Sequence, residues 1–298
     1  MASTSEIKAH IKSIRDTKKI TGAMELIASA KLTKAKAELD ATRPYFNALA
    51  GEIKRIFRTS ARVESRYFYP DEEETHNLNG TYASLVITAD KGLAGAYNQN
   101  VEKEAEKMLS NHADTKLFVV GECGRQYFSR RGIKTEKTFL YTAQNPTMER
   151  AREIADILLE LFDSGQAEKI LITYTDMQSG ADPTVKTTRL LPFHHSQFAK
   201  KGEKTVDESF EFEPSVSAVL NNVIKSYVSG FIYSALVDSF CSEQNARMSA
   251  MNSAGSSADK LLGELTKEYN AQRQAAITRE ITEITAGARA LKRQKEKK

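Results

Sequence analysis

The chain has 298 residues, 40% of them hydrophobic and 28% charged, and its formal net charge of +4 is too small to indicate a nucleic-acid partner. Two cysteines, Cys123 and Cys241, are too few and too far apart for a disulfide framework, and no run of 18 apolar residues could span a membrane. Because the start Met1–Glu6 also lacks an apolar signal core, we expect a protein that faces the cytosol and does not insert into a membrane.

The first helix-forming segment runs from about Ser5 to Arg58. Along it, apolar and small residues recur at alternating steps of three and four, close to the 3.5-residue period of a coiled coil. This stripe consists of Ile7, Ile11, Ile14, Thr17, Thr21, Met24, Ala28, Leu32, Ala35, Leu39, Thr42, Phe46, Leu49, Ile53 and Ile56. Since the stripe stays in phase across Pro44, we expect a kink there and not a break. Residues 1–60 hold twelve Lys and Arg against six Asp and Glu, which favours either acidic partners or a solvated helix face.

Between Tyr82 and Leu191, strand and helix patterns alternate. We expect strands at 82–88, 117–120 and 169–174, further strands within 132–141 and 185–191, and helices at 99–111, 125–131 and 147–163. This alternation predicts a small, mostly parallel sheet with helices on its faces, of a Rossmann-like kind. Residues 61–80 and 198–209 are polar connectors.

A glycine-rich loop, Asp90–Asn98, follows the first expected strand, where a dinucleotide would bind in such a sheet. Its spacing matches neither the G-x-G-x-x-G nor the G-x-x-x-x-G-K-[ST] pattern, so a tight structural turn is favoured over a nucleotide site. Cys123, His194 and His195 have no metal-ligand spacing. The sequence therefore predicts no catalytic residue, no cofactor and no metal.

The second helix-forming segment runs from Ser215 to Lys298 and contains no proline. Unbroken, it would span roughly 120 Å, against a radius of gyration of about 20 Å for a compact chain of this length, so we expect a rod. Its stripe consists of Met248, Met251, Gly255, Ala258, Leu262, Leu265, Tyr269, Gln272 and Ala276. Small residues at 249–258 predict a closely packed partner helix. A shifted stripe of Ile277, Ile281, Ile284, Ala288 and Leu291 predicts an irregular, curved pair there.

Each terminal helix needs a partner, and the chain supplies one at each end. We therefore expect an α/β protein in which the N- and C-terminal helices form a long antiparallel coiled coil beside a small α/β domain. A homodimeric coiled coil is the alternative that the composition of the stripes leaves open. The expected domains are an N-terminal helix at 1–60, the α/β domain with its connectors at 61–209 and a C-terminal helix at 210–298.

Four strings of the sequence carry a family resemblance. They are IKAHIKSIRDTKKITGAM at 7–24, DKGLAG at 90–95, SEQNARMSAM at 242–251 and ITREITEITAGA at 277–288. In this order along the whole chain, they closely resemble the gamma subunit of F-type ATP synthases. The chain departs from the family pattern at Asp16, Gly22 and Ala94, and the basic residues of 292–298 replace the usual short apolar end.

The resemblance implies a central rotor shaft that couples ion-driven rotation of a membrane ring to conformational change in a catalytic hexamer, without an active site of its own. It implies the alpha and beta subunits, the epsilon subunit and the membrane c-ring as partners, and a peripheral position on the cytoplasmic face of the cell membrane.

The same resemblance implies three groups of contact residues. On the first helix, Lys18, Lys19 and Met24 would face acidic loops of the beta subunits. On the second helix, Arg247, Gln274, Thr278 and Glu280 would contact the hexamer, although Glu280 taken alone indicates only a solvated helix face. Phe210, Phe212 and Glu213 would touch polar loops of the membrane ring, unless the two Phe side chains pack on the local sheet.

Two other functions compete with a rotor. One is a nucleotide-binding α/β enzyme that uses the loop Gly92–Gly95 and keeps the coiled coil for assembly. The other is a basic coiled-coil arm for nucleic acid, which lacks the interleaved aromatic residues of a base-stacking platform.

Overall fold

A computed structural model describes residues 3–59, 65–69, 80–112, 114–177, 183–194, 198 and 212–295. The chain divides into two compact units. One unit, here the body, comprises residues 28–247, and the other, here the terminal pair, comprises residues 1–27 together with 248–298. The domain boundaries expected near residues 60 and 210 stay a prediction.

Two long helices dominate the chain, α1 (Thr4–Thr59) and α5 (Val216–Lys295). A capping box stabilises the start of α1. The backbone N–H of Glu6 donates to Ser3 Oγ at 3.2 Å, and the backbone N–H of Ser3 donates to Glu6 Oε2 at 2.7 Å. The helix α1 continues through Pro44, so the proline does not break it. At the start of α5, Ser215 Oγ accepts from the backbone N–H of Ala218 at 3.2 Å.

The body contains a five-stranded sheet in the order β3-β2-β1-β4-β5. Its strands are β1 (Tyr82–Ile87), β2 (Thr115–Val120), β3 (Lys137–Phe139), β4 (Lys169–Asp176) and β5 (Thr184–Leu191). All neighbouring pairs are parallel except β4 and β5, which are antiparallel. The mostly parallel sheet predicted from the sequence is therefore confirmed.

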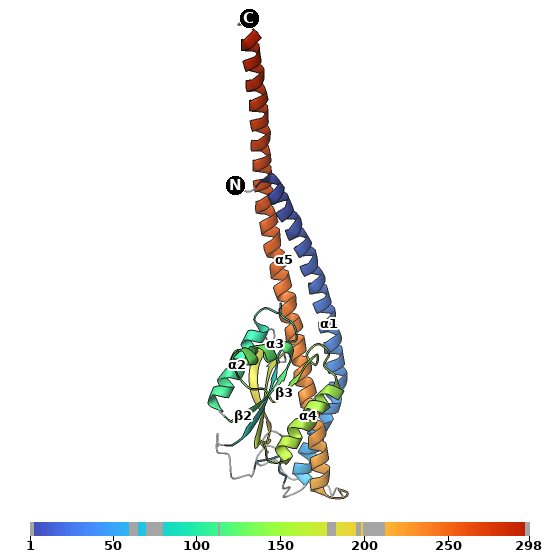
Figure 1. Cartoon of the computed structure of the whole chain (residues 1–298). Helices are drawn as coiled ribbons and strands as arrows, with labels where there is room; N and C mark the ends of the chain where they lie inside the picture. The colour runs from blue at the N-terminus through green and yellow to red at the C-terminus, as the bar shows by residue number, and fades with distance from the viewer. Residues whose placement is uncertain are drawn as a thin grey trace. The chain divides into compact units, whose positions relative to one another are not determined.

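Helices cover both faces of this sheet (Figure 1). The helices α2 (Tyr97–Asn111) and α3 (Glu122–Arg130) pack on the face that carries Val86, Leu117 and Val119. The opposite face carries Leu85 and Ile87 and is covered by α4 (Met148–Asp163) and by the body segments of α1 and α5. Successive side chains of a strand point to opposite faces, so one buried strand supplies both cores.

Within the body, α1 and α5 pair in antiparallel directions. Phe46 packs on Tyr233 with ring centroids 6.2 Å apart, whereas the earlier α1 residues Lys36 and Asp40 act electrostatically on the later α5 residue Cys241. The stripe residues Ala35, Leu39, Ile53 and Ile56 are buried, as predicted. The two helices are in tight contact at Gly230, where an added Cβ would overlap the ring of Phe46.

In the terminal pair, the predicted seam is also buried at Ile7, Ile11, Met251 and Ala258, but Thr17 is exposed. The small residues at 249–258 predict close backbone packing, and this prediction is wrong at Gly255, because a Cβ added there meets nothing within 4 Å. The shifted stripe after residue 276 does not continue the pair either. As Figure 1 shows, α5 extends past the N-terminal end of α1, and the stripe residues from Ile277 to Ala288 are exposed, with no partner helix among the described residues.

Candidate partner-binding surfaces

The C-terminal part of α5 exposes an apolar stripe between polar residues. Every residue from 273 to 289 is exposed, and this includes the sequence-predicted contact residues Gln274, Thr278 and Glu280. Ile277, Ile281 and Ile284 are 44%, 59% and 66% exposed. They lie three and four residues apart and so share one face of the helix. Exposed apolar side chains grouped in this way mark an interaction surface.

The predicted contact residues of α1 lie in the terminal pair, and one of them has an internal role. Lys18 Nζ donates to both carboxylate oxygens of Asp259 on α5, at 2.5 and 2.7 Å. Lys19 Nζ lies 3.4 Å from Asp16 Oδ1 and its side chain is 80% exposed. Met24 is half-buried. Lys19 is therefore the more available of the two cations.

Sequence reasoning missed three neighbours of these residues. Ile20, Leu26 and Ile27 are 61%, 73% and 56% exposed. Each is a large apolar side chain at a position outside the stripe. A large apolar residue on the predicted solvent face of a helix is the signal that could have identified them. Together with Lys19, they form a mixed apolar and basic surface on the terminal pair.

Arg247 has a different position from the one expected. It was predicted to face a partner, but its side chain is only 11% exposed and pairs with Glu243, which is 6% exposed, at 2.6 Å. A second guanidinium nitrogen donates to the backbone carbonyls of Lys91 and Gly92 at 3.2 and 3.1 Å. This clasp, formed by Arg247, Glu243 and the two carbonyls, ties α5 to the loop after β1. The fork of Arg247 is thus used inside the chain, and a contact between Arg247 and a partner stays a prediction.

The loop after β1 is a structural turn. Asp90 Oδ1 accepts from the backbone N–H groups of Glu122 and Tyr141, at 3.1 and 3.3 Å, so one carboxylate joins the ends of β1, β2 and β3. The carbonyls of Lys91 and Gly92 point at a cation, whereas a phosphate cradle presents N–H groups. The geometry therefore fits the tight turn and does not favour the nucleotide-binding alternative.

The turn before α5 contains the third predicted group. Phe210 lies outside the described residues. Phe212 is half-buried and packs against the main core of the body, and Glu213 is exposed. Phe212 is thus partly covered by the core of its own chain, and its contact with a membrane ring stays a prediction.

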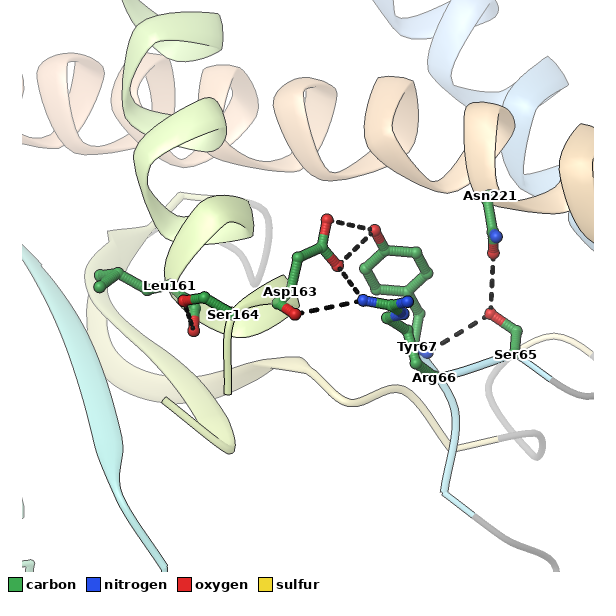
Figure 2. A network of polar contacts seen from close by, with 7 residues as sticks. All are labelled: Ser65, Arg66, Tyr67, Leu161, Asp163, Ser164 and Asn221. Atoms are coloured by element: carbon green, nitrogen blue, oxygen red, sulfur yellow. Dashed lines mark hydrogen bonds and ion pairs between the residues drawn. The ribbon is translucent and has the colours of Figure 1, made fainter. Parts of the chain in front are cut away.

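A polar network fixes the chain near this turn (Figure 2). Tyr67 Oη donates to the carboxylate of Asp163 at the end of α4, at 2.8 Å, and Arg66 donates to the carbonyl of the same residue at 3.2 Å. Ser65 Oγ donates to Asn221 Oδ1 on α5 at 3.1 Å. Burial, followed by the hydrogen bond to Asp163, raises the pKa of Tyr67, so its hydroxyl remains a donor at neutral pH. The segment 65–69 is therefore anchored to two helices.

Comparison with known proteins gives this arrangement its context. A family model described as ATP synthase matches residues 3–291. The ATP synthase gamma chain of Ruminiclostridium cellulolyticum is 43% identical over 290 residues, which cover 96% of this chain and 98% of the relative. The chain belongs to the ATP synthase gamma chain family. The gamma chain of Acetivibrio thermocellus is 40% identical over 98% of this chain and all of the relative.

Solved structures agree on the fold of this gamma chain family. A chain in the rotor of the Euglena gracilis mitochondrial ATP synthase, in rotational state 1, matches with a TM-score of 0.64. The match covers 92% of this chain and 98% of the other at 15% identity. The family model and the relatives confirm the resemblance seen in the four sequence strings, and the chain is a subunit of an ATP synthase.

Both thiols of this gamma chain family member lie in surroundings that disfavour the thiolate. Burial, reinforced by nearby carboxylates, raises the pKa of Cys123 to about 11, and burial raises that of Cys241 to about 11 as well. Both thiols are therefore protonated at neutral pH and are poor nucleophiles. Within the described ranges, no group of three or more His, Cys, Asp or Glu residues could hold a metal ion. None of the described helices has the length and apolar character needed to cross a bilayer.

Proposed function

We propose that the chain is the central rotor shaft of the ATP synthase and performs no bond chemistry itself. The observation that carries this proposal is the exposed stripe of Ile277, Ile281 and Ile284, set among polar side chains on an isolated stretch of α5. A helix that exposes such a stripe needs a partner. The alpha and beta subunits of the catalytic hexamer are the partner that family membership suggests.

The proposed mechanism is differential binding. A shaft without an active site changes a catalytic site only by binding its conformations with different free energies. Moving a two-state site from 1:99 to 99:1 requires about 5.5 kcal/mol of such a difference. Burial of three isoleucine side chains contributes roughly 1.5–3 kcal/mol each when complete, so partial contact of this stripe in one orientation is of the right size.

Polar residues beside the stripe would fix the orientation of the chain relative to the hexamer. We propose that Gln274, Thr278 and Glu280 on α5, and Lys19 and Met24 on α1, contact the hexamer, because all but Met24 are exposed in the terminal pair. Lys18 contributes there mainly by holding the pair together through Asp259. Arg247 acts through the clasp and positions the loop at Lys91 and Gly92.

At the other end of the proposed assembly, Phe210, Phe212 and Glu213 would meet the polar loops of the membrane c-ring. Glu213 is the exposed member of this turn. The anchored segment 65–69 and its aromatic neighbours would keep the turn fixed. We propose that the epsilon subunit binds the body and that the complex places this chain peripherally on the cytoplasmic face of the cell membrane.

The test is reconstitution with the alpha and beta subunits. Replacing Ile277, Ile281 and Ile284 together by Ser should prevent co-purification of the chain with the hexamer, or strongly reduce ATPase activity of the complex. The matched control is Leu140→Ser, which removes an exposed apolar side chain (42%) from the body. If the triple variant assembles and hydrolyses ATP like the control, this stripe is not the contact surface.

A titration of the isolated chain with ATP and ADP distinguishes the rotor function from the alternative of a nucleotide-binding enzyme that uses the loop Gly92–Gly95. The rotor should show no saturable binding, because the carbonyls of Lys91 and Gly92 already accept from Arg247. Tight nucleotide binding by the isolated chain would favour the enzyme.

A further inference from the structure

The body contains a cavity of about 230 Å³ at the junction of α1, α5 and the β4–β5 edge of the sheet. Its walls include Phe46 of α1, Tyr174 and Asp176 of β4, Lys186 of β5, and Phe231 and Asp238 of α5. A cavity of about 150 Å³ in another protein accommodates benzene, so this one is large enough for a small organic molecule.

Asp238 is the unusual group in this cavity. It is only 5% exposed, yet none of the described residues forms a hydrogen bond or ion pair with its carboxylate. Its neighbour Asp176 is paired with Lys186. The two carboxylates and one ammonium group of the cavity wall thus leave one negative charge without a direct partner. A buried carboxylate in this situation either takes up a proton or attracts a cation.

The aromatic walls favour the cation. Phe231 and Tyr174 meet edge to face, with ring centroids 6.1 Å apart, and Phe46 closes the α1 side. Lys186 Nζ already lies 5.6 Å from the centroid of the Tyr174 ring. Aromatic rings attract ammonium groups through their quadrupole, and they pack equally well against an apolar stem.

We propose that this cavity is a binding site for a small primary ammonium compound with an apolar or aromatic stem, and that Asp238 is its charge partner. No residue of the site is among the contact residues named above for the ATP synthase partners, so the inference does not depend on the rotor function.

The groups that face Asp238 also give the site a pH dependence. They are Asp176 of β4, Lys186 of β5, Arg43 of α1, Tyr174 of β4 and Cys241 of α5 itself. Burial, with a further contribution from Asp176, raises the pKa of Asp238 to about 6. A cation binds the ionised carboxylate, so its affinity should be about tenfold lower at pH 5 than at pH 7.

The probe is benzylammonium chloride, titrated into the full-length chain and followed by calorimetry or by ligand-observed NMR. We expect saturable binding at pH 7 with a dissociation constant on the order of 1 mM. Benzyl alcohol, which lacks the charge, should bind at least tenfold more weakly. Asp238→Asn should weaken benzylammonium binding at least tenfold, whereas Asp156→Asn, an exposed carboxylate of α4, should leave it unchanged.

A second variant tests the volume independently of the charge. Ala50→Leu adds side-chain atoms to the α1 wall and retains every charged group, and it should abolish binding. Circular dichroism checks that each variant is folded. No saturable binding by the unaltered chain, or equal affinity of the unaltered chain and Asp238→Asn, would overturn the proposal.

Discussion

Arg247 illustrates how a single side chain connects distant parts of the body. Its guanidinium joins Glu243, one helical turn earlier, to the carbonyls of Lys91 and Gly92 in the loop after β1. Burial raises the pKa of Glu243, and the charge and hydrogen bond of Arg247 oppose that shift. Glu243 therefore depends on Arg247 to remain charged in a buried position.

We predict that Arg247→Ala destabilises the isolated chain by about 3 kcal/mol, because the buried carboxylate of Glu243 and two carbonyls lose their donor. Urea unfolding measures this change. Arg273→Ala, on an exposed face of the same helix, should change the free energy of unfolding by less than about 0.5 kcal/mol. Equal stabilities of the two variants would mean that the clasp contributes nothing.

Asp238 should make stability depend on pH in an unusual direction. Its pKa rises on folding from an ordinary value of 3.8 to about 6, so between these values the folded state binds more protons than the unfolded state. This residue therefore stabilises the fold less as pH rises from about 4 to 6, and above that range its contribution is constant. The full shift is equivalent to about 3 kcal/mol.

Asp238→Asn isolates this contribution, since other carboxylates titrate in the same range. We predict that the variant is more stable than the unaltered chain at pH 7, by up to about 3 kcal/mol, and that the difference disappears near pH 4. Urea unfolding of both proteins at several pH values measures it. A difference that is independent of pH would contradict the buried, unpaired position of this carboxylate.

At the scale of elements, the periodic signals were sufficient to predict the helices and strands. Every residue of the stripe from Ile7 to Ile56 except Thr17 is buried or half-buried, and each predicted strand of the sheet is present. The contacts that periodicity cannot show are those between residues far apart in the chain. Arg247 reaches carbonyls more than 150 residues away, and nothing in its local sequence indicates this.

The glycine at which the two helices pack tightly could not be predicted from the sequence either. Small residues at 249–258 suggested it, yet Gly255 has free space around its Cα whereas Gly230 lies against Phe46. A glycine is selected either for close packing or for other reasons, and composition does not distinguish these cases. Six of the ten candidate contact residues lie in the four family strings, and one of the six, Arg247, donates to groups inside the chain.

The two glycines give opposite predictions for the same substitution. Gly230→Ala should destabilise the chain by about 1–3 kcal/mol, because the new methyl group overlaps the ring of Phe46. Gly255→Ala should stabilise it by about 0.5–1 kcal/mol, because alanine is the better helix former and nothing lies within 4 Å. Thermal unfolding of both variants tests this, and stabilisation by Gly230→Ala would show that α1 and α5 are not in close contact there.

At the scale of the whole molecule, the body and the C-terminal part of α5 differ in how they use their polar and apolar side chains. The body uses its polar groups internally, in the clasp, in the Asp90 turn and in the network around Asp163. The C-terminal part of α5 instead leaves its isoleucines exposed. A gamma chain that uses these polar groups of its body internally and exposes isoleucines at its helix end is suited to bind a partner through that helix end.

Single-molecule observation of the complex with alpha and beta subunits tests the rotor function most directly. A marker is attached to a cysteine placed at the exposed Lys107 of α2, with the hexamer fixed to a surface. We predict that the marker rotates in one direction when ATP is supplied and stops when a non-hydrolysable analogue replaces it. A marker that remains stationary while the same complexes hydrolyse ATP at the normal rate would contradict a rotor.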